Sequence, residues 1–232
     1  MIIGSTEWEK TIIKGAKALN INIDQKSVKL FAAHADELIQ WNKTVNLTSI
    51  TDPFEIAVKH YIDSIYPVSL MPKGFFSILD MGSGGGFPGI PLKIILPDIS
   101  FTLIDSSRKK VSFLKHIIRS LNLKNITAHH VRAELFFNDT NFKPFDIIIC
   151  RAFSSLKNIV EKSLPLLAEN GTIIAMKGLC IDKEVDSFSL LLNKTSKEID
   201  TKGLRITTKK YALPFIGAKR TVVMLKQTIL KA

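Results

Sequence analysis

The sequence predicts an α/β fold with a mostly parallel, doubly wound sheet, an antiparallel last strand and an N-terminal helical cap. From residue 75 onward, apolar segments typical of strands alternate with helical segments, which favours a parallel sheet covered on both faces. The last two apolar segments are joined by a short loop containing Pro214 and Gly217. That loop is too short for a crossover helix, so the two strands should pair antiparallel.

The first 70 residues have the periodicity of helices. Asp24 is placed to cap a helix whose apolar residues recur every three or four positions. These are Val28, Phe31, Ala32, Ala35, Leu38 and Ile39, and Trp41 continues the same face. The pair Asp52-Pro53 should start the next helix, which runs through Ile62. We therefore expect residues 1–70 to form a helical cap and residues 71–232 to form the main domain.

The main domain should contain seven strands and four helices. The strands are expected at 76–80, 100–105, 125–131, 145–150, 171–176, 204–212 and 220–226. The helices are expected at 88–96, 106–121, 155–168 and 181–192.

Composition excludes several classes of protein. No apolar run approaches the roughly 20 residues of a membrane span, and the N-terminus lacks the features of a signal peptide. Cys150 and Cys180 are too few for a disulfide framework or a zinc site. We expect a cytoplasmic protein with reduced thiols, no membrane partner and no metal site.

The positive charge is concentrated in the main domain. The formal net charge is +11, yet residues 1–70 contain seven Lys and eight Asp or Glu. This imbalance indicates a polyanionic partner, with nucleic acid first. The alternative is a general lysine bias of the source proteome.

A glycine cluster follows the first predicted strand. The strand ends at Asp80, the cluster contains Gly82, Gly84, Gly85, Gly86 and Gly89, and the next strand ends at Asp105. This order, in which a strand is followed by a glycine turn, a helix and a second strand that ends in an acid, is typical of a nucleotide-type pocket at the carboxyl edge of a parallel sheet. A purely structural turn with solvated acids is the alternative.

Two details favour S-adenosylmethionine over NAD as the ligand. Asp80 stands directly before the glycines, and Pro88 lies in the loop where a pyrophosphate needs N–H donors. The spacing Asp80-x-Gly82-x-Gly84-x-Gly86 instead resembles the first motif of class I methyltransferases. S-adenosylmethionine has no phosphate and carries a sulfonium, which a nearby carboxylate stabilises. Asp105 suits the ribose, because a carboxylate can accept from two hydroxyl groups.

Other candidate site residues follow later strands. Arg151 follows the strand FDIIIC and is placed to hold the cofactor's methionine carboxylate or a substrate phosphate, unless it is a plain surface arginine. Ala133 and Glu134 follow the third strand, where a carboxylate can accept from the adenine amino group. Cys150 invites comparison with cytosine-C5 methyltransferases, which use a cysteine nucleophile. It lacks a Pro-Cys turn, so a small buried side chain is favoured.

The chain resembles the small-subunit ribosomal RNA methyltransferase G family, also called glucose-inhibited division protein B. The matching segments are WNKTVNLTSITDP (41–53), KHYIDS (59–64), LDMGSGGGFPGIPL (79–92), FTLIDSSRKKVSFLKH (101–116), RAELF (132–136), FDIIICRAFSSL (145–156) and MKG (176–178). The C-terminal strands match loosely. The resemblance implies a Rossmann-like class I methyltransferase domain.

The resemblance also implies a function. Family members methylate N7 of one guanine in 16S rRNA with S-adenosylmethionine. Their cofactor contacts fall here on Gly82, Phe87, Ala133, Glu134 and Arg151. The implied partner is 16S rRNA or the small ribosomal subunit, and we expect a monomer. Three alternatives stay open: a methyltransferase for protein or small molecules, a non-catalytic RNA-binding or ribosome-assembly factor, and an NAD oxidoreductase.

Overall fold

The computed structural model describes residues 1–74, 76–138, 142–178, 181–193 and 203–227. Cys180 lies outside the described residues, as do the basic residues of 194–202 and 228–232. No helix in the described part of the chain is long and apolar enough to cross a membrane.

One seven-stranded sheet organises the described residues, in the order β3-β2-β1-β4-β5-β7-β6. The strands are β1 (Ser77–Met81), β2 (Ser100–Asp105), β3 (Ile126–His130), β4 (Phe145–Arg151), β5 (Leu167–Lys177), β6 (Leu204–Ala212) and β7 (Lys219–Gln227). Strands β1 to β5 pair parallel, whereas β7 runs antiparallel to both β5 and β6. The predicted sheet and its antiparallel last strand are confirmed.

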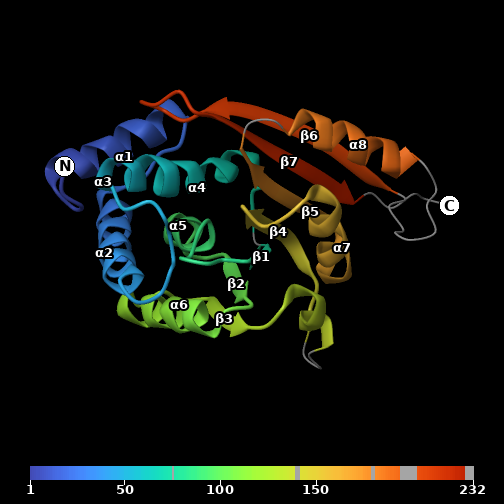
Figure 1. The fold of residues 1–232 in the computed structure, drawn as a ribbon, viewed down its shortest axis with the longest axis horizontal. Coiled ribbons are helices and arrows are strands. Elements are labelled where there is room, and N and C mark those ends of the chain that lie inside the picture. The colour runs from blue at the N-terminus through green and yellow to red at the C-terminus, as the bar shows by residue number, and fades with distance from the viewer. Residues whose placement is uncertain (75, 139–141, 179–180, 194–202, 228–232) are drawn as a thin grey trace.

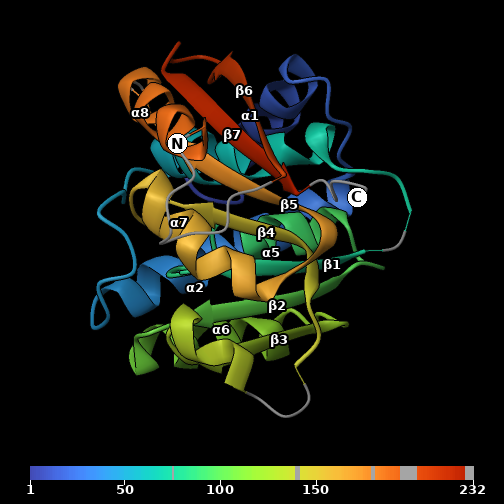
Figure 2. The same ribbon diagram turned by 90° about the vertical axis from the view of Figure 1, so that its right-hand side faces the viewer.

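Helices cover both faces of the sheet, as Figures 1 and 2 show. The helices are α1 (Thr6–Ala18), α2 (Gln25–Asn42), α3 (Pro53–Glu55), α4 (Asp63–Ile65), α5 (Gly89–Ile95), α6 (Arg108–Ser120), α7 (Leu156–Ser163) and α8 (Asp182–Asn193). One buried cluster joins the sheet to α1, α2, α5 and α6, and a second joins it to α7 and α8. Short 3₁₀ segments span Tyr66–Leu70, Ala133–Asn138 and Leu164–Leu166.

The N-terminal helices share their core with the sheet layer. Asp24 and Asp52 cap their helices as predicted, each accepting from a backbone N–H three residues later. Trp8 and Phe31 are fully buried in the cluster that also contains Ile90 of α5. The Trp8 indole Nε1 donates to the Pro53 carbonyl at 2.9 Å, which ties α1 to the start of α3. The division of the chain at residue 70 stays a prediction.

Two segments differ from the predicted elements. The helix expected over 155–168 ends at Ser163, and β5 begins at Leu167, because Pro165 has no N–H for a continuing helix. The helix that starts at Asp52 has the expected extent, but Ile56–Ile62 winds as a π-helix. Such segments are rare and often occur at functional sites. Here the segment carries Lys59 and His60.

Candidate functional site

The glycine loop turns back against the end of β2. The Gly82 and Ser83 N–H groups donate to the Ile104 carbonyl at 2.9 and 3.1 Å. Gly82 has φ +79°, and a Cβ there would lie 2.5 Å from the Phe153 ring. This position therefore requires glycine, both for its backbone conformation and for the approach of Phe153.

Asp105, the last residue of β2, accepts hydrogen bonds that hold the same loop in place. Its Oδ2 accepts from the Gly84 N–H at 2.9 Å, and its Oδ1 accepts from the Ser107 N–H at 2.8 Å. Each carboxylate oxygen keeps a further acceptor site. Asp105 can thus hold the loop and still accept hydrogen bonds from a ligand.

A cavity of about 490 Å³ opens beside this loop at the carboxyl edge of the sheet. That volume lies within the range of about 300–1,000 Å³ typical of small-molecule sites. Four predicted residues line it: Gly82, Asp105, Ala133 and Glu134. Glu134 is half exposed and pairs with Lys162 at 3.4 Å. We call this space, with its rim residues Lys110, Phe153 and Asn158, the glycine-loop cavity.

Asp80 lies under the loop and does not line the cavity. Its fully buried side chain accepts from the Gly89 N–H at 2.9 Å through Oδ2, which fixes the start of α5. Burial raises the pKa of Asp80 to about 7. A Cβ on Gly89 would lie 2.5 Å from the same carboxylate oxygen, so this contact needs glycine at 89. Direct contact of Asp80 with a cofactor stays a prediction, as it does for Gly84 and Gly86.

His34 of α2 supports the loop from the opposite side. Its Nε2 lies 3.1 Å from the Gly85 carbonyl, and its Nδ1 lies 3.0 Å from the Tyr61 hydroxyl. Complete burial lowers the pKa of His34 to about 3, so the ring is neutral. Because a carbonyl only accepts, Nε2 carries the proton and Tyr61 donates to Nδ1. Sequence analysis missed His34; its one signal was a histidine on the apolar face of a predicted helix.

Arg151 leaves β4 and turns toward the π-helix. Its Nη1 donates to the Lys59 carbonyl at 2.8 Å, and its Nη2 lies 3.1 Å from His60 Nδ1. The guanidinium also stands over the Phe87 ring, 5.1 Å from the ring centre. Phe87 is buried and stacks on His60, with 4.4 Å between ring centres. Contacts of Arg151 and Phe87 with a cofactor stay predictions.

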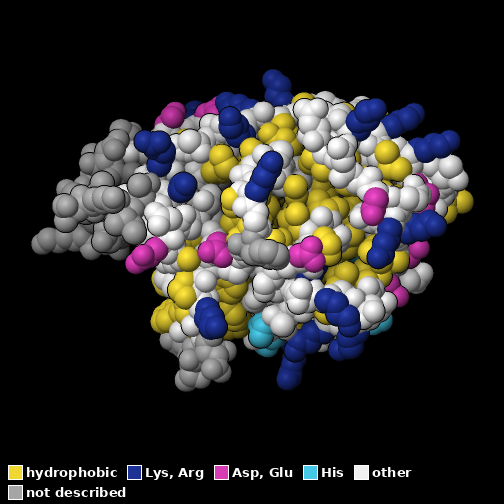
Figure 3. All heavy atoms as spheres, turned by 180° about the vertical axis from the view of Figure 1, so that it is seen from behind, with side chains coloured by type: hydrophobic (Ala, Val, Ile, Leu, Met, Phe, Trp, Pro, Cys, Tyr) yellow, Lys and Arg dark blue, Asp and Glu magenta, His cyan; other side chains and the backbone are white. Residues whose placement is uncertain are grey.

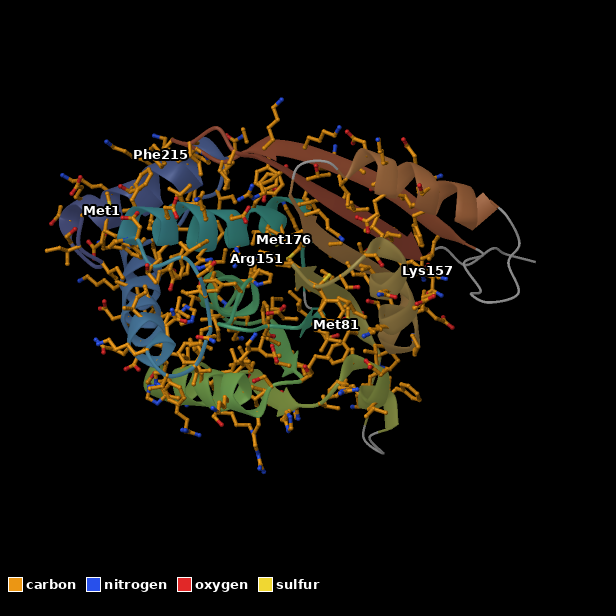
Figure 4. All side chains as sticks on the ribbon, in the orientation of Figure 1. Met1, Met81, Arg151, Lys157, Met176 and Phe215 are labelled. Carbon is orange, nitrogen blue, oxygen red and sulfur yellow. The ribbon has the colours of Figure 1, made fainter. Side chains whose placement is uncertain are left out.

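A second cavity of about 570 Å³ lies in front of Arg151. We call it the Arg151 cavity. Its walls are Leu47, Thr48, Ser49, Ile50, Lys59, His60, Asp63, Arg151, Ala152, Met176, Lys177, Gly178 and Arg220. Figure 4 shows Arg151 next to Met176, its register partner on β5, while Met81 lies at the end of β1.

Ala152 lines both cavities. Its φ of +49° is unusual for a residue with a Cβ. Strained backbone of this kind clusters at ligand sites, where the surrounding structure maintains it. The two cavities therefore meet at the turn that follows β4.

Asp63 holds the wall of the Arg151 cavity together. Its Oδ1 accepts from the Tyr211 hydroxyl at 2.6 Å, and its Oδ2 lies 3.5 Å from both Arg151 and Arg220. This one carboxylate, in a side chain that is 6% exposed, thus connects α4 with β4, β6 and β7. The chain separation of its partners explains why sequence analysis did not single it out.

A family model described as "GidB: rRNA small subunit methyltransferase G" matches residues 27–205, which is more than half of the chain. The chain belongs to the rRNA small subunit methyltransferase G family. A member named ribosomal RNA small subunit methyltransferase G from Acetivibrio thermocellus is 36% identical over 220 residues, covering 94% of this chain and 88% of the relative. The protein of that name from Desulforamulus reducens is 38% identical, covering 94% and 89%.

Solved structures support the methyltransferase fold of this family member. An O-methyltransferase from Bacillus cereus, in complex with SAH, superposes with a TM-score of 0.61 at 16% identity, covering 93% of this chain and 97% of that chain. TomG from Streptomyces achromogenes superposes with a TM-score of 0.59 at 14% identity, covering 98% and 100%. At these identities the likeness shows the fold, and it agrees with the predicted Rossmann-like class I methyltransferase.

Cys150 is 1% exposed in the buried cluster on the α7 side of the sheet. Burial raises the pKa of its thiol to about 12, so the thiolate needed of a nucleophile is not formed near neutral pH. In the described residues no group of three His, Cys, Asp or Glu side chains could hold a metal ion.

Proposed function

We propose that this protein transfers a methyl group from S-adenosylmethionine to N7 of one guanine in 16S rRNA. The observation that carries the proposal is the glycine-loop cavity, where Gly82, Asp105 and Glu134 meet in a chain of this family. The family resemblance implies N7 as the methylated atom. Chemistry agrees, because N7 has a free in-plane lone pair and needs no catalytic nucleophile or base before it attacks the methyl group.

The residues of the glycine-loop cavity fit the cofactor. Asp105 is 8% exposed and would accept from the two ribose hydroxyls, while it keeps its bonds to the loop. Glu134 would accept from the adenine amino group, and Ala133 and Gly82 would form apolar walls without large side chains. When bound, S-adenosylmethionine supplies an electrophilic methyl group on a sulfonium. Cofactor contacts of Asp80, Phe87 and Arg151 stay predictions. In addition, we propose that Asp80 supports the site by fixing the start of α5, and that Phe87 and Arg151 support it by holding each other and the π-helix in place.

The chain's own task is positioning. His34 and Asp105 hold the glycine loop, and the turn at Ala152 connects the cofactor's cavity to the Arg151 cavity. Holding two reactants in line replaces a bimolecular encounter by a step within one complex, which is a large part of many enzymatic rates. A guanine in the Arg151 cavity would face a cofactor methyl group across Ala152.

The test uses small subunits, or 16S rRNA, that lack the modification. Methylation at N7 makes guanine cationic and sensitive to borohydride and then aniline. After incubation with the enzyme and S-adenosylmethionine, this treatment should cut the RNA at a single guanosine, and RNA incubated without cofactor should stay intact there. Methyl label in protein, in cytosine or on an exocyclic amine would contradict the proposal. Calorimetry should show binding of S-adenosylmethionine and none of NAD.

The rRNA substrate should be held partly by basic residues. Arg108, Lys109 and Lys110 start α6 beside the glycine-loop cavity, and Lys110 lines it. On the face in Figure 3, Lys and Arg side chains are dispersed around a central area of hydrophobic side chains. RNA affinity should fall with salt, and Lys109→Ala should reduce that dependence without changing cofactor affinity.

An rRNA substrate also favours a cytoplasmic enzyme, and we propose that it acts as a monomer.

A further inference from the structure

The segment between α2 and α3 contributes Thr48 to the Arg151 cavity, and the chain holds this residue firmly. Asn42 at the end of α2 accepts from the Leu47 and Thr48 N–H groups through Oδ1, at 2.8 and 3.0 Å. Its Nδ2 donates to the Thr48 carbonyl at 2.9 Å. Three hydrogen bonds to one side chain fix the backbone on either side of Thr48.

The direction of the Thr48 hydroxyl follows from its neighbours. An arginine only donates, so Arg151 Nη2 donates to His60 Nδ1, and the proton of the neutral His60 ring lies on Nε2. Burial lowers the pKa of His60 to about 3, which keeps the ring neutral. His60 Nε2 lies 2.8 Å from Thr48 Oγ1 and therefore donates to it.

A second donor occupies the other lone pair of the same oxygen. The Ile50 N–H donates to Thr48 Oγ1 at 3.0 Å. With both lone pairs used, the hydroxyl can act toward a ligand only as a donor. Within the described part of the chain no acceptor lies at hydrogen-bond distance from this proton.

The cationic side chains of the cavity already have partners. Arg151 donates to Lys59 and His60, and Arg220 pairs with Asp63. Lys177 donates to the Ser154 carbonyl and pairs with Glu184. Lys59, the remaining cation of the wall, pairs with Glu55. The Ser49 hydroxyl also lines the cavity, but no hydrogen bond to a described residue fixes its direction. The Thr48 hydroxyl is thus a donor of fixed direction whose proton no described residue accepts.

We propose that the Thr48 hydroxyl donates a hydrogen bond to O6 of the target guanine and so selects guanine over adenine. This inference rests on the proposed function. The edge of guanine that carries N7 presents two acceptors, N7 and O6, whereas adenine has an amino donor in place of O6. The common guanine contact, an arginine bidentate to N7 and O6, would block the attacking lone pair. A single donor at O6 recognises the base and leaves N7 free.

The test compares guanosine with 2-aminopurine ribonucleoside, which keeps N7 but lacks O6, at the methylated position of semi-synthetic 16S rRNA. The wild-type enzyme should methylate the analogue with a kcat/KM about tenfold or more lower, the scale of one lost hydrogen bond that leaves a donor unpaired. Thr48→Val should have a lower kcat/KM on guanosine than the wild type, and its kcat/KM values on the two substrates should be equal. Thr48→Ser should behave as the wild type does.

The controls separate recognition from a structural effect. Thr44→Val changes an exposed threonine of the same segment, whose hydroxyl donates to the Trp41 carbonyl, and should leave the ratio unchanged. If Thr48→Val lowers both rates by the same factor, the residue is structural and the inference fails. If the wild-type enzyme methylates 2-aminopurine as well as guanosine, the inference fails whatever the variant does. If the wild type modifies no guanosine N7 at all, the proposed function fails first.

Discussion

The two cavities at the carboxyl edge of the sheet differ in how their residues are distributed along the chain. Every wall of the glycine-loop cavity belongs to the last residues of β1 or β2, to the segments that follow β1 to β4, or to the helices α6 and α7. The Arg151 cavity instead combines Thr48 and His60 of the N-terminal part with Arg151 of β4 and Arg220 of β7. Parallel strands bring their ends together by topology, whereas the second cavity depends on how the N-terminal helices pack.

The largest expected effect breaks the Arg151 cavity. Asp63→Ala should lower the free energy of unfolding by about 3–5 kcal/mol, because it leaves the Arg151 guanidinium, in a side chain only 17% exposed, without its carboxylate. Urea denaturation followed by circular dichroism measures this. Asp182→Ala is the matched control. Asp182 pairs with Lys210, which precedes Tyr211 on β6, and both side chains of this pair are more than 60% exposed. The control should change stability by under about 1 kcal/mol. Equal losses would mean that Asp63 does not hold the cavity together.

A second change acts on the glycine-loop cavity. Asp105→Ala should weaken S-adenosylmethionine binding by about 1–3 kcal/mol, through lost bonds to the ribose and to Gly84. Isothermal calorimetry gives the affinity. Asp146→Ala is a suitable control, because Asp146 caps the opposite end of the sheet by accepting from Ser77. Undiminished affinity in Asp105→Ala would remove this residue from the cofactor site.

A third prediction concerns pH and the support that α2 gives the loop. The pKa of His34 is lowered to about 3 in the fold against about 6.5 in an unfolded chain, so the unfolded state binds more protons between these values. The stabilisation by neutral His34 is therefore complete above pH 6.5 and is lost as the pH falls. Between pH 4.5 and 6, His34 should make the free energy of unfolding of the wild type rise by about 1.4 kcal/mol per pH unit. His34→Gln should lack this part of the rise.

Asp80 should act in the opposite direction. Its pKa is raised to about 7, so its contribution to stability is complete below about pH 3.8 and is lost as the pH rises toward 7. Asp80→Asn should therefore steepen the fall of stability on acidification, while His34→Gln makes it shallower. Urea midpoints measured at several pH values distinguish the two variants, and parallel pH profiles for both would contradict the assigned protonation states.

The smallest effect is expected at Cys150 in the buried core. Cys150→Ala should keep nearly full methyl-transfer activity, because the buried thiol faces the α7 side of the core and takes no part in attack by N7. Initial rates with labelled cofactor measure this. A folded, cofactor-binding variant without activity would point instead to a covalent cytosine-type mechanism.

The sequence alone determined the sheet and the glycine-loop cavity to a large extent. Apolar periodicity, the glycine cluster and acids at strand ends are local signals, and parallel topology brings the strand ends to one edge. Gly82, Asp105, Ala133 and Glu134 were found in this way, and they line one cavity. The end of α7 was misplaced because the effect of Pro165 was not weighed against the helical pattern.

Only the tertiary structure decided the rest of the site. It turned Arg151 toward the Lys59 carbonyl, placed Asp80 beneath the loop and brought His34 against Gly85. Each of these contacts except that of Asp80 with Gly89 joins residues at least 50 positions apart. Hydrogen bonds of this kind depend on the packing of whole helices against the sheet. No local pattern of residues encodes their direction, and so the Arg151 cavity emerged only from the folded chain.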